Sequence, residues 1–447
     1  MKTRFAILLA ALLVAPALFG ASQLPPNARV AIIGDSITEQ KLYSKYMEAY
    51  LLACTGRKDI HVMQFGWSGE TASGFAARCL NDLAAFEPNV ATTCYGMNDG
   101  GYQPWKDSIG QGYEGNMRNV VKQLSAAGVK HIILGSPGAV DSKFFGTRPV
   151  FGDKNSAAGY NDTLAHLRDI AEKLATENHQ AFANVHNAMF DAMPKAKAAL
   201  GDDYPVCGGD GFHPGPNGQL LMAYAFLKGL GVDGDIGTVT VDAKGMTTAT
   251  DGHKVLSSGA GKAEIESTRW PFCFDADPKN ANSTRSILPF APFNQDLNRF
   301  TLKVKNLTAA KAKVTWSTMT KEFTKEELKA FVGATGGGIV NEVTKEFSKE
   351  QLEAGVNLAA EFPSTPFDAQ FAKLVGVLGQ KQAFETTMIK SLVTNFRQFA
   401  NDTKADPELA KAFDTVRTKL QSRQQVLDAE ARKTLVPVKH TLTVTAL

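Results

Sequence analysis

The feature that most constrains the fold is a regular alternation of two kinds of hydrophobic run between residues 28 and 230. Short runs rich in β-branched residues are typical of buried strands, whereas the longer runs between them space their apolar residues as an amphipathic helix does. Alternating strands and helices favour a parallel sheet covered on both faces. The sequence therefore predicts a doubly wound α/β sandwich with strands at 29–33, 60–65, 90–95, 131–134 and, more weakly, 182–186.

After residue 232 the pattern changes, which divides the chain into a unit at 27–232 and a second unit at 233–447. Apolar residues now alternate with period two, which predicts a smaller antiparallel β module. Residues 366–433 return to a helical pattern, and the chain ends in one more alternating run. We expect that last run to complete the module, with the helices inserted or packed alongside. The alternating runs are 238–242, 262–267, 299–304, 313–316 and 440–447.

A short duplication lies inside the second unit. Residues 320–332 and 344–356 are identical at nine of thirteen positions. In each copy a hydroxyl residue is followed three positions later by Glu or Gln: Thr324 by Glu327, and Ser348 by Gln351. That spacing is typical of a capping box at the start of a helix. We expect two equivalent corners between a strand and a helix turn, rather than a functional repeat.

The first 22 residues have the pattern of a secretory signal peptide. Lys2 and Arg4 precede an apolar run from Phe5 to Phe19, and small residues follow that run. The run is too short to span a bilayer, and no second long apolar segment follows. We expect cleavage near Ser22 and a secreted or periplasmic mature protein, with no membrane span.

Charge and cysteine content narrow the function classes. The 48 basic and 45 acidic side chains leave a net charge of +3 with no long basic run, so nothing indicates a nucleic-acid partner. Five cysteines are too few for a disulfide scaffold, and none forms a CxxC pair that would indicate a metal site. If any pair is oxidised, Cys94 and Cys207 are the first candidates. Buried free thiols are at least as good an expectation.

Polar residues follow the first three predicted strands. Residues 34–38 read GDSIT, residues 66–71 read GWSGET, and residues 95–99 read YGMND. In a doubly wound sheet, ligands bind at the carboxyl ends of the strands, so these three segments should converge. Two of the three segments also have an ordinary explanation: Gly-Asp-Ser suits a helix N-cap, and the third segment suits a turn.

The three segments together match the needs of acyl transfer. Ser36 would lie at the start of a helix, where unpaired backbone N–H groups favour negative charge. Gly69 has no side chain, so its N–H can approach a ligand closely. Asn98 adds a side-chain amide donor, and three such donors around one point form an oxyanion hole. The pattern predicts a nucleophile with a hole for the charge that its attack creates.

A serine nucleophile requires a base with an orienting acid. Of eight histidines, His213 lies in the Gly- and Pro-rich segment GGDGFHPGPNG, with Asp210 three residues earlier. That spacing lets Asp210 accept a hydrogen bond from one ring nitrogen while the other faces Ser36. The remaining histidines have no such setting, and we expect structural or surface roles for them.

These four segments resemble the signature blocks of the SGNH, or GDSL-type, serine hydrolases over residues 28–230. The resemblance implies a flavodoxin-like α/β/α sandwich with a five-stranded parallel sheet and no metal or organic cofactor. It also implies that Ser36, His213 and Asp210 are nucleophile, base and orienter, and that Ser36, Gly69 and Asn98 donate to the oxyanion. Asp35 and Asp99, which adjoin two of these residues, are candidate supporting groups.

Aromatic residues beside the blocks are candidates for a substrate wall. Trp67, Tyr95, Tyr102, Trp105 and Phe212 would stack on sugar rings or pack against acyl groups, although aromatic residues more often serve the core. Tyr102 and Trp105, in a polar loop, are the best of them. The candidate substrate-binding set is Trp67, Tyr102, Trp105 and Phe212.

An exported member of this family with an added β module resembles the carbohydrate esterases that deacetylate polysaccharides. The leading hypothesis is therefore hydrolysis of an O-acetylated polysaccharide or oligosaccharide. A lipolytic esterase or lysophospholipase and a polysaccharide O-acetyltransferase remain as enzyme alternatives, and a non-catalytic glycan-binding protein is a remote one. The sequence leaves open what the C-terminal unit does and which oligomer forms.

Overall fold

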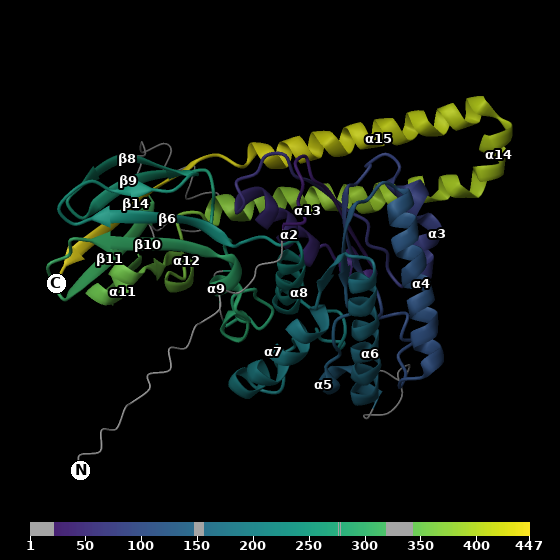
Figure 1. Ribbon diagram of the computed structural model, residues 1–447, viewed down its shortest axis with the longest axis horizontal. Helices are drawn as coiled ribbons and strands as arrows, with labels where there is room; N and C mark the ends of the chain where they lie inside the picture. The colour runs from purple at the N-terminus through teal and green to yellow at the C-terminus, as the bar shows by residue number, and fades with distance from the viewer. Residues whose placement is uncertain (1–21, 147–155, 276, 278, 319–342) are drawn as a thin grey trace, which may run out of the picture.

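The computed structural model describes residues 22–146, 156–275, 277, 279–318 and 343–447 (Figure 1). The expected signal peptide, apart from its last residue, and the first copy of the duplication lie outside these residues. In Figure 1 the β-rich part lies on the left and the α/β part on the right, and the long helices α13 and α15 extend from the β-rich part over the α/β part.

The first unit contains one five-stranded sheet whose neighbouring strands are all parallel. The strand order is β2-β1-β3-β4-β5, which is the flavodoxin-like order, so the predicted fold is confirmed. The predicted strands recur with small changes at their ends. They are β1 Arg29–Gly34, β2 His61–Gln64, β3 Val90–Cys94, β4 His131–Gly135 and β5 Ala181–Ala183.

The weakest predicted strand was partly wrong. We expected a strand at 182–186, but β5 stops at Ala183, and Val185 already begins helix α7. The reason is Asn184, whose side chain accepts a hydrogen bond from the N–H of Asn187 and so caps the helix.

Both faces of the sheet are covered. Along β1, Val30 and Ile32 belong to one buried core, and Ala31 and Ile33 belong to the other, as the two-residue period of a strand requires. The first core lies under α2 (Tyr43–Ala53), α7 (Val185–Leu200) and α8 (Pro216–Gly229), and the second under α3 (Ala72–Leu83), α4 (Asp107–Ala126) and α6 (Ser156–Glu177). Two short helices, α1 (Ser36–Glu39) and α5 (Ser142–Phe145), interrupt the loops.

The second unit contains two sheets, in the orders β13-β10-β6-β7 and β12-β11-β14-β9-β8. The second of these sheets is antiparallel throughout, as predicted. In the first, however, β6 and β10 are parallel, which corrects the prediction. The chain between them passes through the other sheet, which supplies the long crossover that parallel strands need. The strands are β6 Asp235–Asp242, β7 Thr248–Ala249, β8 His253–Gly259, β9 Lys262–Ser267, β10 Arg299–Lys305, β11 Lys311–Thr318, β12 Val343–Ser348, β13 Val356–Asn357 and β14 Val438–Ala446.

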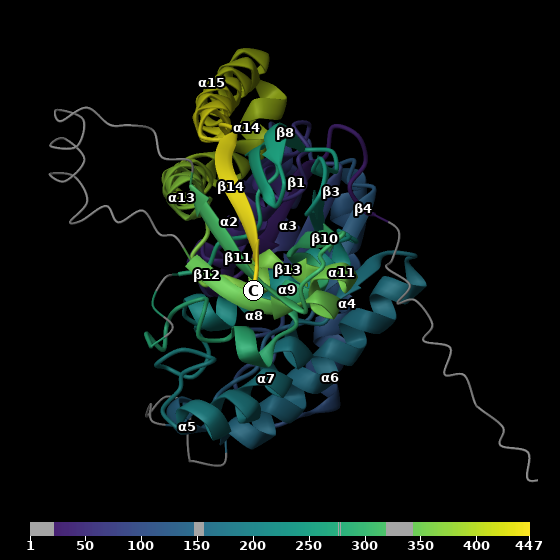
Figure 2. The same ribbon diagram turned by 90° about the vertical axis from the view of Figure 1, so that its left-hand side faces the viewer.

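The last strand completes the module, as expected: β14 pairs with β11 on one side and β9 on the other. Figure 2 shows β14 in yellow, next to β11 and close to the C-terminus. Its His440 is buried, and the ring nitrogens lie 2.8 Å from Ser267 Oγ and 3.1 Å from Trp316 Nε1. Burial, with a smaller contribution from His253, lowers the pKa of His440 to about 3. This histidine has the structural role that the sequence predicted for it.

The second copy of the duplication forms the expected corner. The strand β12 leads into α11 (Lys349–Ala354), and Ser348 and Gln351 make both hydrogen bonds of a capping box. Four further short helices complete the connections, namely η2 Leu288–Phe290, α9 Phe293–Leu297, α12 Leu358–Glu361 and α14 Ala400–Ala405.

All five cysteines are free thiols, so the candidate bridge between Cys94 and Cys207 is absent. The Sγ atom of Cys94 instead lies 3.5 Å from the carbonyl oxygen of Ser136. Both thiols are buried, and burial raises the pKa of each well above its ordinary value.

The predicted helical segment forms a hairpin that packs on the first unit. It consists of α13 (Asp368–Ser391), a 3₁₀ stretch η3 (Val393–Phe399), α14 and α15 (Pro407–Lys433). The helix α13 contacts α2 and the edge strand β2, and η3 contacts α3. In sequence these helices belong to the C-terminal unit, whereas in space they cover the edge of the N-terminal sheet.

The hairpin supplies hydrogen-bond partners to the free edge of β2. Lys381 Nζ donates to the carbonyl oxygen of Val62 at 2.7 Å, and Glu385 Oε2 accepts from the N–H of Gln64 at 3.0 Å. On α15, Arg432 donates to the carbonyl oxygen of Ile60. An edge strand otherwise presents unpaired backbone groups, so these side chains take the place of a sixth strand.

A buried ion cluster lies at this contact. Lys381 Nζ is 2.7 Å from carboxylate oxygens of both Glu48 and Glu385, and all three side chains are fully buried. Burial raises the pKa of Glu48 to about 7, against the opposing effect of Lys381. Burial lowers the pKa of Lys381, but the two carboxylates outweigh it and raise that pKa.

We predict that Lys381→Met lowers the free energy of unfolding by about 3–5 kcal/mol, because it leaves two buried carboxylates without their cation. Lys373 lies on the same helix and is exposed. Lys373→Met is therefore the matched control, and it should change stability by no more than about 0.5 kcal/mol. Urea unfolding of both variants measures the difference. Equal stability of the two variants would contradict a structural role for the cluster.

Candidate active site

Ser36 lies where β1 turns into the short helix α1. The side chain of Asp35 caps this helix by accepting from the N–H of Ile37 at 3.0 Å. The strand ends at Gly34, where a Cβ atom would lie 2.1 Å from Thr38 Oγ1, so only glycine allows the turn. The Ser36 side chain is partly exposed at the carboxyl edge of the sheet.

The loop before α8 brings the candidate base, His213, to Ser36. Gly208 adopts a φ of +81°, and a Cβ atom there would lie 1.9 Å from the carbonyl oxygen of His213. The loop can fold back this tightly only with glycine at that position. It places Asp210 and His213 beside Ser36, although they are separated from it by more than 170 residues in the sequence.

The three side chains form an unbroken chain of contacts. Ser36 Oγ lies 2.8 Å from His213 Nε2, and His213 Nδ1 lies 2.8 Å from Asp210 Oδ2. A carboxylate accepts, so Nδ1 carries the ring hydrogen and Nε2 is left to accept the serine proton.

Asp210 is held in its charged form. Its Oδ1 atom accepts from the backbone N–H groups of Phe212, at 3.1 Å, and His213, at 2.9 Å. Burial raises the pKa of Asp210, but the hydrogen bonds from His213 and Phe212 outweigh it and lower that pKa to about 2. The carboxylate is therefore ionised at neutral pH, and its hydrogen bond with Nδ1 orients the ring of His213.

Two more donors lie at the ends of β2 and β3. Gly69 is exposed and has a φ of +74°, and no atom lies within 4 Å of the place where its Cβ would be. Asn98 Nδ2 donates to the carbonyl oxygen of Glu70 at 2.9 Å, while Asn98 Oδ1 accepts from Tyr102 Oη at 2.8 Å. These two bonds fix the orientation of the Asn98 amide.

Buried carboxylates lie beneath the site, including both candidate supporting residues. Burial, with repulsion from Asp99 and Glu70, raises the pKa of Asp35 to about 7, against the hydrogen bond from Ile37. Burial raises the pKa of Asp99 to about 6, although its carboxylate accepts from the N–H groups of Ala72 and Gly96 at 3.0 Å each. The two aspartates support the loops that carry Ser36 and Asn98.

Glu70 has a buried cation of its own, which sequence analysis did not identify. Arg78 on α3 donates to both carboxylate oxygens of Glu70, at 2.6 and 2.7 Å, and to Asp82 at 2.8 Å. Tyr95 Oη donates to Glu70 at 2.7 Å. The eight-residue separation of Glu70 and Arg78 across a loop and a helix start gives no recognisable motif.

The structure separates the candidate aromatic residues. Trp67 is half-buried beside the Gly69 turn, and the rings of Tyr102 and Phe212 lie 5.5 Å apart near the triad. Phe212 is only 5% exposed and packs on the ring of His213, so it supports the base rather than forming an open wall. Trp105 stacks on His166 at 4.2 Å, between α4 and α6, and Tyr95 is fully buried. Trp105 and Tyr95 therefore serve the core.

A cation from the C-terminal hairpin reaches the same region. Lys390 Nζ lies 2.8 Å from both carboxylate oxygens of Glu39, and 5.0 Å from the centre of the Trp67 ring. Glu39 in turn accepts a hydrogen bond from the N–H of Ser68. No sequence pattern could have found this contact, because Glu39 and Lys390 are 351 positions apart.

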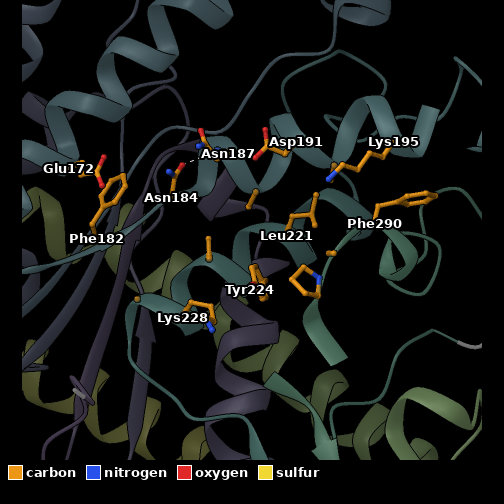
Figure 3. A pocket seen from close by; sticks show the side chains of 16 residues that line it. Glu172, Phe182, Asn184, Asn187, Asp191, Lys195, Leu221, Tyr224, Lys228 and Phe290 are labelled. Atoms are coloured by element: carbon orange, nitrogen blue, oxygen red, sulfur yellow. Dashed lines mark hydrogen bonds between the residues drawn. The ribbon is translucent and has the colours of Figure 1, made fainter. Parts of the chain in front are cut away.

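A cavity of about 520 Å³ lies elsewhere, between α6, α7, α8 and η2 (Figure 3). It is lined by apolar side chains such as Phe182 and Leu221 and by charged ones such as Asp191 and Lys195. None of the triad or of the oxyanion donors lines it. The candidate site is instead at the carboxyl ends of β1, β2 and β3.

Comparison with known proteins agrees with this geometry. Residues 32–221 match the model of the GDSL-like lipase/acylhydrolase family. This segment belongs to the GDSL-like lipase/acylhydrolase family. The protein is a carboxylic ester hydrolase, and its GDSL domain carries all five residues of the candidate triad and oxyanion hole. No curated protein has a matching sequence.

Solved structures show how far the architecture extends. A gut microbial diltiazem-metabolizing enzyme is 20% identical and has a TM-score of 0.67, with 95% of this chain and 99% of that chain covered. The shared fold therefore includes the β module and the hairpin. A catalytic mutant of Axe2, an acetylxylan esterase from Geobacillus stearothermophilus, covers 47% of this chain and 97% of its own at 23% identity, with a TM-score of 0.37.

Neither a membrane span nor a metal cluster is found in the part of the chain that the structure describes. No described helix is both long enough and apolar enough to cross a bilayer. Among the same residues, no three His, Cys, Asp or Glu side chains are grouped so that they could hold a metal ion.

We predict that Tyr102→Phe lowers kcat on an aryl acetate about fivefold, because it removes one hydrogen bond to Asn98. Trp105→Leu should leave kcat and KM within about twofold while it lowers the melting temperature, since Trp105 packs between helices. Steady-state kinetics and thermal unfolding separate the two effects. A larger kinetic loss for Trp105→Leu would place Trp105 in the site.

Proposed function

We propose that the GDSL domain hydrolyses esters through a covalent acyl-enzyme, with Ser36, His213 and Asp210 as its triad. The observation that carries the proposal is the pair of 2.8 Å contacts that join Ser36 Oγ to His213 and His213 to Asp210. The family match supports the reaction class.

In the first step, His213 Nε2 takes the proton of Ser36 as Oγ attacks the ester carbonyl carbon. The carbonyl oxygen becomes an oxyanion, which the backbone N–H groups of Ser36 and Gly69 and the Asn98 amide stabilise. Asp210 stabilises the imidazolium that forms.

The tetrahedral intermediate then collapses. The C–O bond to the alcohol breaks, His213 gives its proton to the departing oxygen, and the acyl group stays on Ser36. Water attacks this acyl-enzyme with His213 again acting as base. The carboxylic acid leaves, and Ser36 recovers its proton.

For the substrate, we propose an O-acetylated polysaccharide or oligosaccharide. Trp67 supports this class because it stands half-buried beside the exposed residues Ser68 and Gly69, where a sugar ring bearing the acetyl group would lie. The open surroundings of Gly69 suit a bulky alcohol with a small acyl group. We also propose that the first 22 residues direct the enzyme to the periplasm or outside the cell.

We predict that Ser36→Ala lowers kcat/KM on an aryl acetate by about 10⁴-fold or more, because no other group replaces the nucleophile. Asn98→Ala should lower kcat by about 10²- to 10³-fold, through loss of one oxyanion donor. Ser125→Ala, at an exposed position on α4, is the matched control and should leave kcat and KM unchanged. Normal turnover by Ser36→Ala would refute the mechanism, whereas a parent protein that cleaves no ester would favour the glycan-binding alternative.

An ester panel on the purified protein tests the substrate proposal. We expect acetate release from acetylated xylan and xylooligosaccharides to exceed hydrolysis of long-chain and phospholipid esters. Diltiazem belongs in the panel because an enzyme of the same architecture is described as metabolizing it. Faster cleavage of lipid esters would favour the lipolytic alternative. Acetyl transfer to an added sugar acceptor, in place of hydrolysis, would favour an acetyltransferase.

A further inference from the structure

The turn that carries Gly69 is exposed, so hydrogen bonds rather than packing must fix it. Ser68 and Gly69 are both exposed, and the turn closes with a hydrogen bond from the N–H of Glu70 to the carbonyl oxygen of Trp67 at 3.1 Å. Gly69 is the third residue of this turn, and its positive φ is typical of type II.

The direction of the Gly69 N–H depends on the peptide plane between Ser68 and Gly69. That plane turns by about 180° between type I and type II turns, because the two types differ mainly in the central dihedral angles. If it flipped, the Gly69 N–H would point away from the oxyanion. The site therefore needs a group that holds the backbone at Ser68.

Glu39 is that group. Its carboxylate accepts from the N–H of Ser68, immediately before the peptide plane in question. Glu39 ends the short helix α1 that begins at Ser36, so one short element places both the nucleophile and the acceptor for the turn. A free carboxylate on a surface samples several rotamers, and it holds a partner well only when it is itself fixed.

Lys390 fixes Glu39 from the C-terminal hairpin. Its Nζ lies 2.8 Å from each Glu39 oxygen, and the Lys390 and Glu39 side chains are only 28% and 23% exposed. The ammonium group also lies 5.0 Å from the Trp67 ring centre. Lys390 thus contacts both Glu39, at the end of α1, and Trp67, in the turn that carries Gly69.

The helix that carries Lys390 is itself fixed. Lys381 and Glu385, nine and five residues earlier, bond to the backbone of β2, and Met388 and Ile389 are buried in the core under α3 and α4. Lys390 therefore approaches the turn from a rigid element rather than from a loop.

We propose that Lys390 is a positioning residue for the oxyanion-binding turn: by fixing Glu39 it holds the Gly69 N–H toward Ser36. The inference rests on the proposed function, because it assigns Gly69 a role in that mechanism. It makes the C-terminal hairpin part of the catalytic apparatus, although no atom of Lys390 touches the substrate's reacting carbon.

The test uses Lys390→Met in the full-length chain. We expect kcat on an aryl acetate to fall about 10-fold with KM within twofold, because a misplaced donor weakens transition-state binding and spares substrate binding. The affinity for an aryl boronic acid, which forms a tetrahedral adduct on the serine, should fall by a similar factor. Lys390→Arg, which keeps the charge and can bind both oxygens, should recover most of the kcat. Lys373→Met is the control and should match the parent.

A double-mutant cycle identifies the partner. Glu39→Gln removes the charge that Lys390 holds, so it should lower kcat as Lys390→Met does, and the double variant should be no slower than the slower single variant. Additive losses would overturn the coupling.

Two results would overturn the positioning role itself. One is unchanged kcat and boronate affinity in Lys390→Met. The other is a loss of kcat that follows a fall in melting temperature and is not recovered by Lys390→Arg, which would indicate a structural role. Ser36→Ala distinguishes these results from failure of the mechanism. If Ser36→Ala is inactive and Lys390→Met is fully active, only the positioning role is refuted. If Ser36→Ala is active, the proposed mechanism is refuted, and the positioning role that rests on it is refuted as well.

Discussion

The rest of the structure depends on how the open edge of β2 is satisfied. Lys381 and Glu385 bond to the carbonyl oxygen and the N–H of this strand, and Lys381 is buried between two carboxylates. Burying a charge is favourable only if its partners are close and well aligned, so this cluster permits one register of α13 on the sheet. The same contacts cover an edge that would otherwise pair with another chain.

That register has consequences at the active site. The strand β2 leads directly into the turn that carries Gly69. The contacts that fix β2 therefore also fix the position of that turn. On the same helix, nine residues beyond Lys381, Lys390 places its Nζ 2.8 Å from the carboxylate of Glu39. The C-terminal segment is thus a support for the GDSL domain as well as a part of the β module, which β14 completes on its return.

The sequence predicted the elements that are determined by residues close together in the chain. Strand periodicity located the parallel sheet, and Ser348 with Gln351 located a helix start, because a capping box is formed by residues three apart. The sequence did not predict features that depend on contacts with neighbouring residues in the folded structure. Asn184 ended a predicted strand by capping a helix, β6 and β10 paired in parallel through a crossover, and Trp105 packed between helices instead of facing the site.

For the candidate site, the sequence by itself determined which residues are the candidates: Ser36, Gly69, Asn98, Asp210 and His213 each follow a strand or lie in a glycine-rich loop, and a doubly wound sheet brings strand ends together. The tertiary structure alone decided which residues hold these groups in place. Arg78 and Lys390 act on Glu70 and Glu39 by contacts whose spacing follows no period, since they join separate elements. Local periodicity encodes secondary structure, whereas such pairings arise only when the folded surfaces meet.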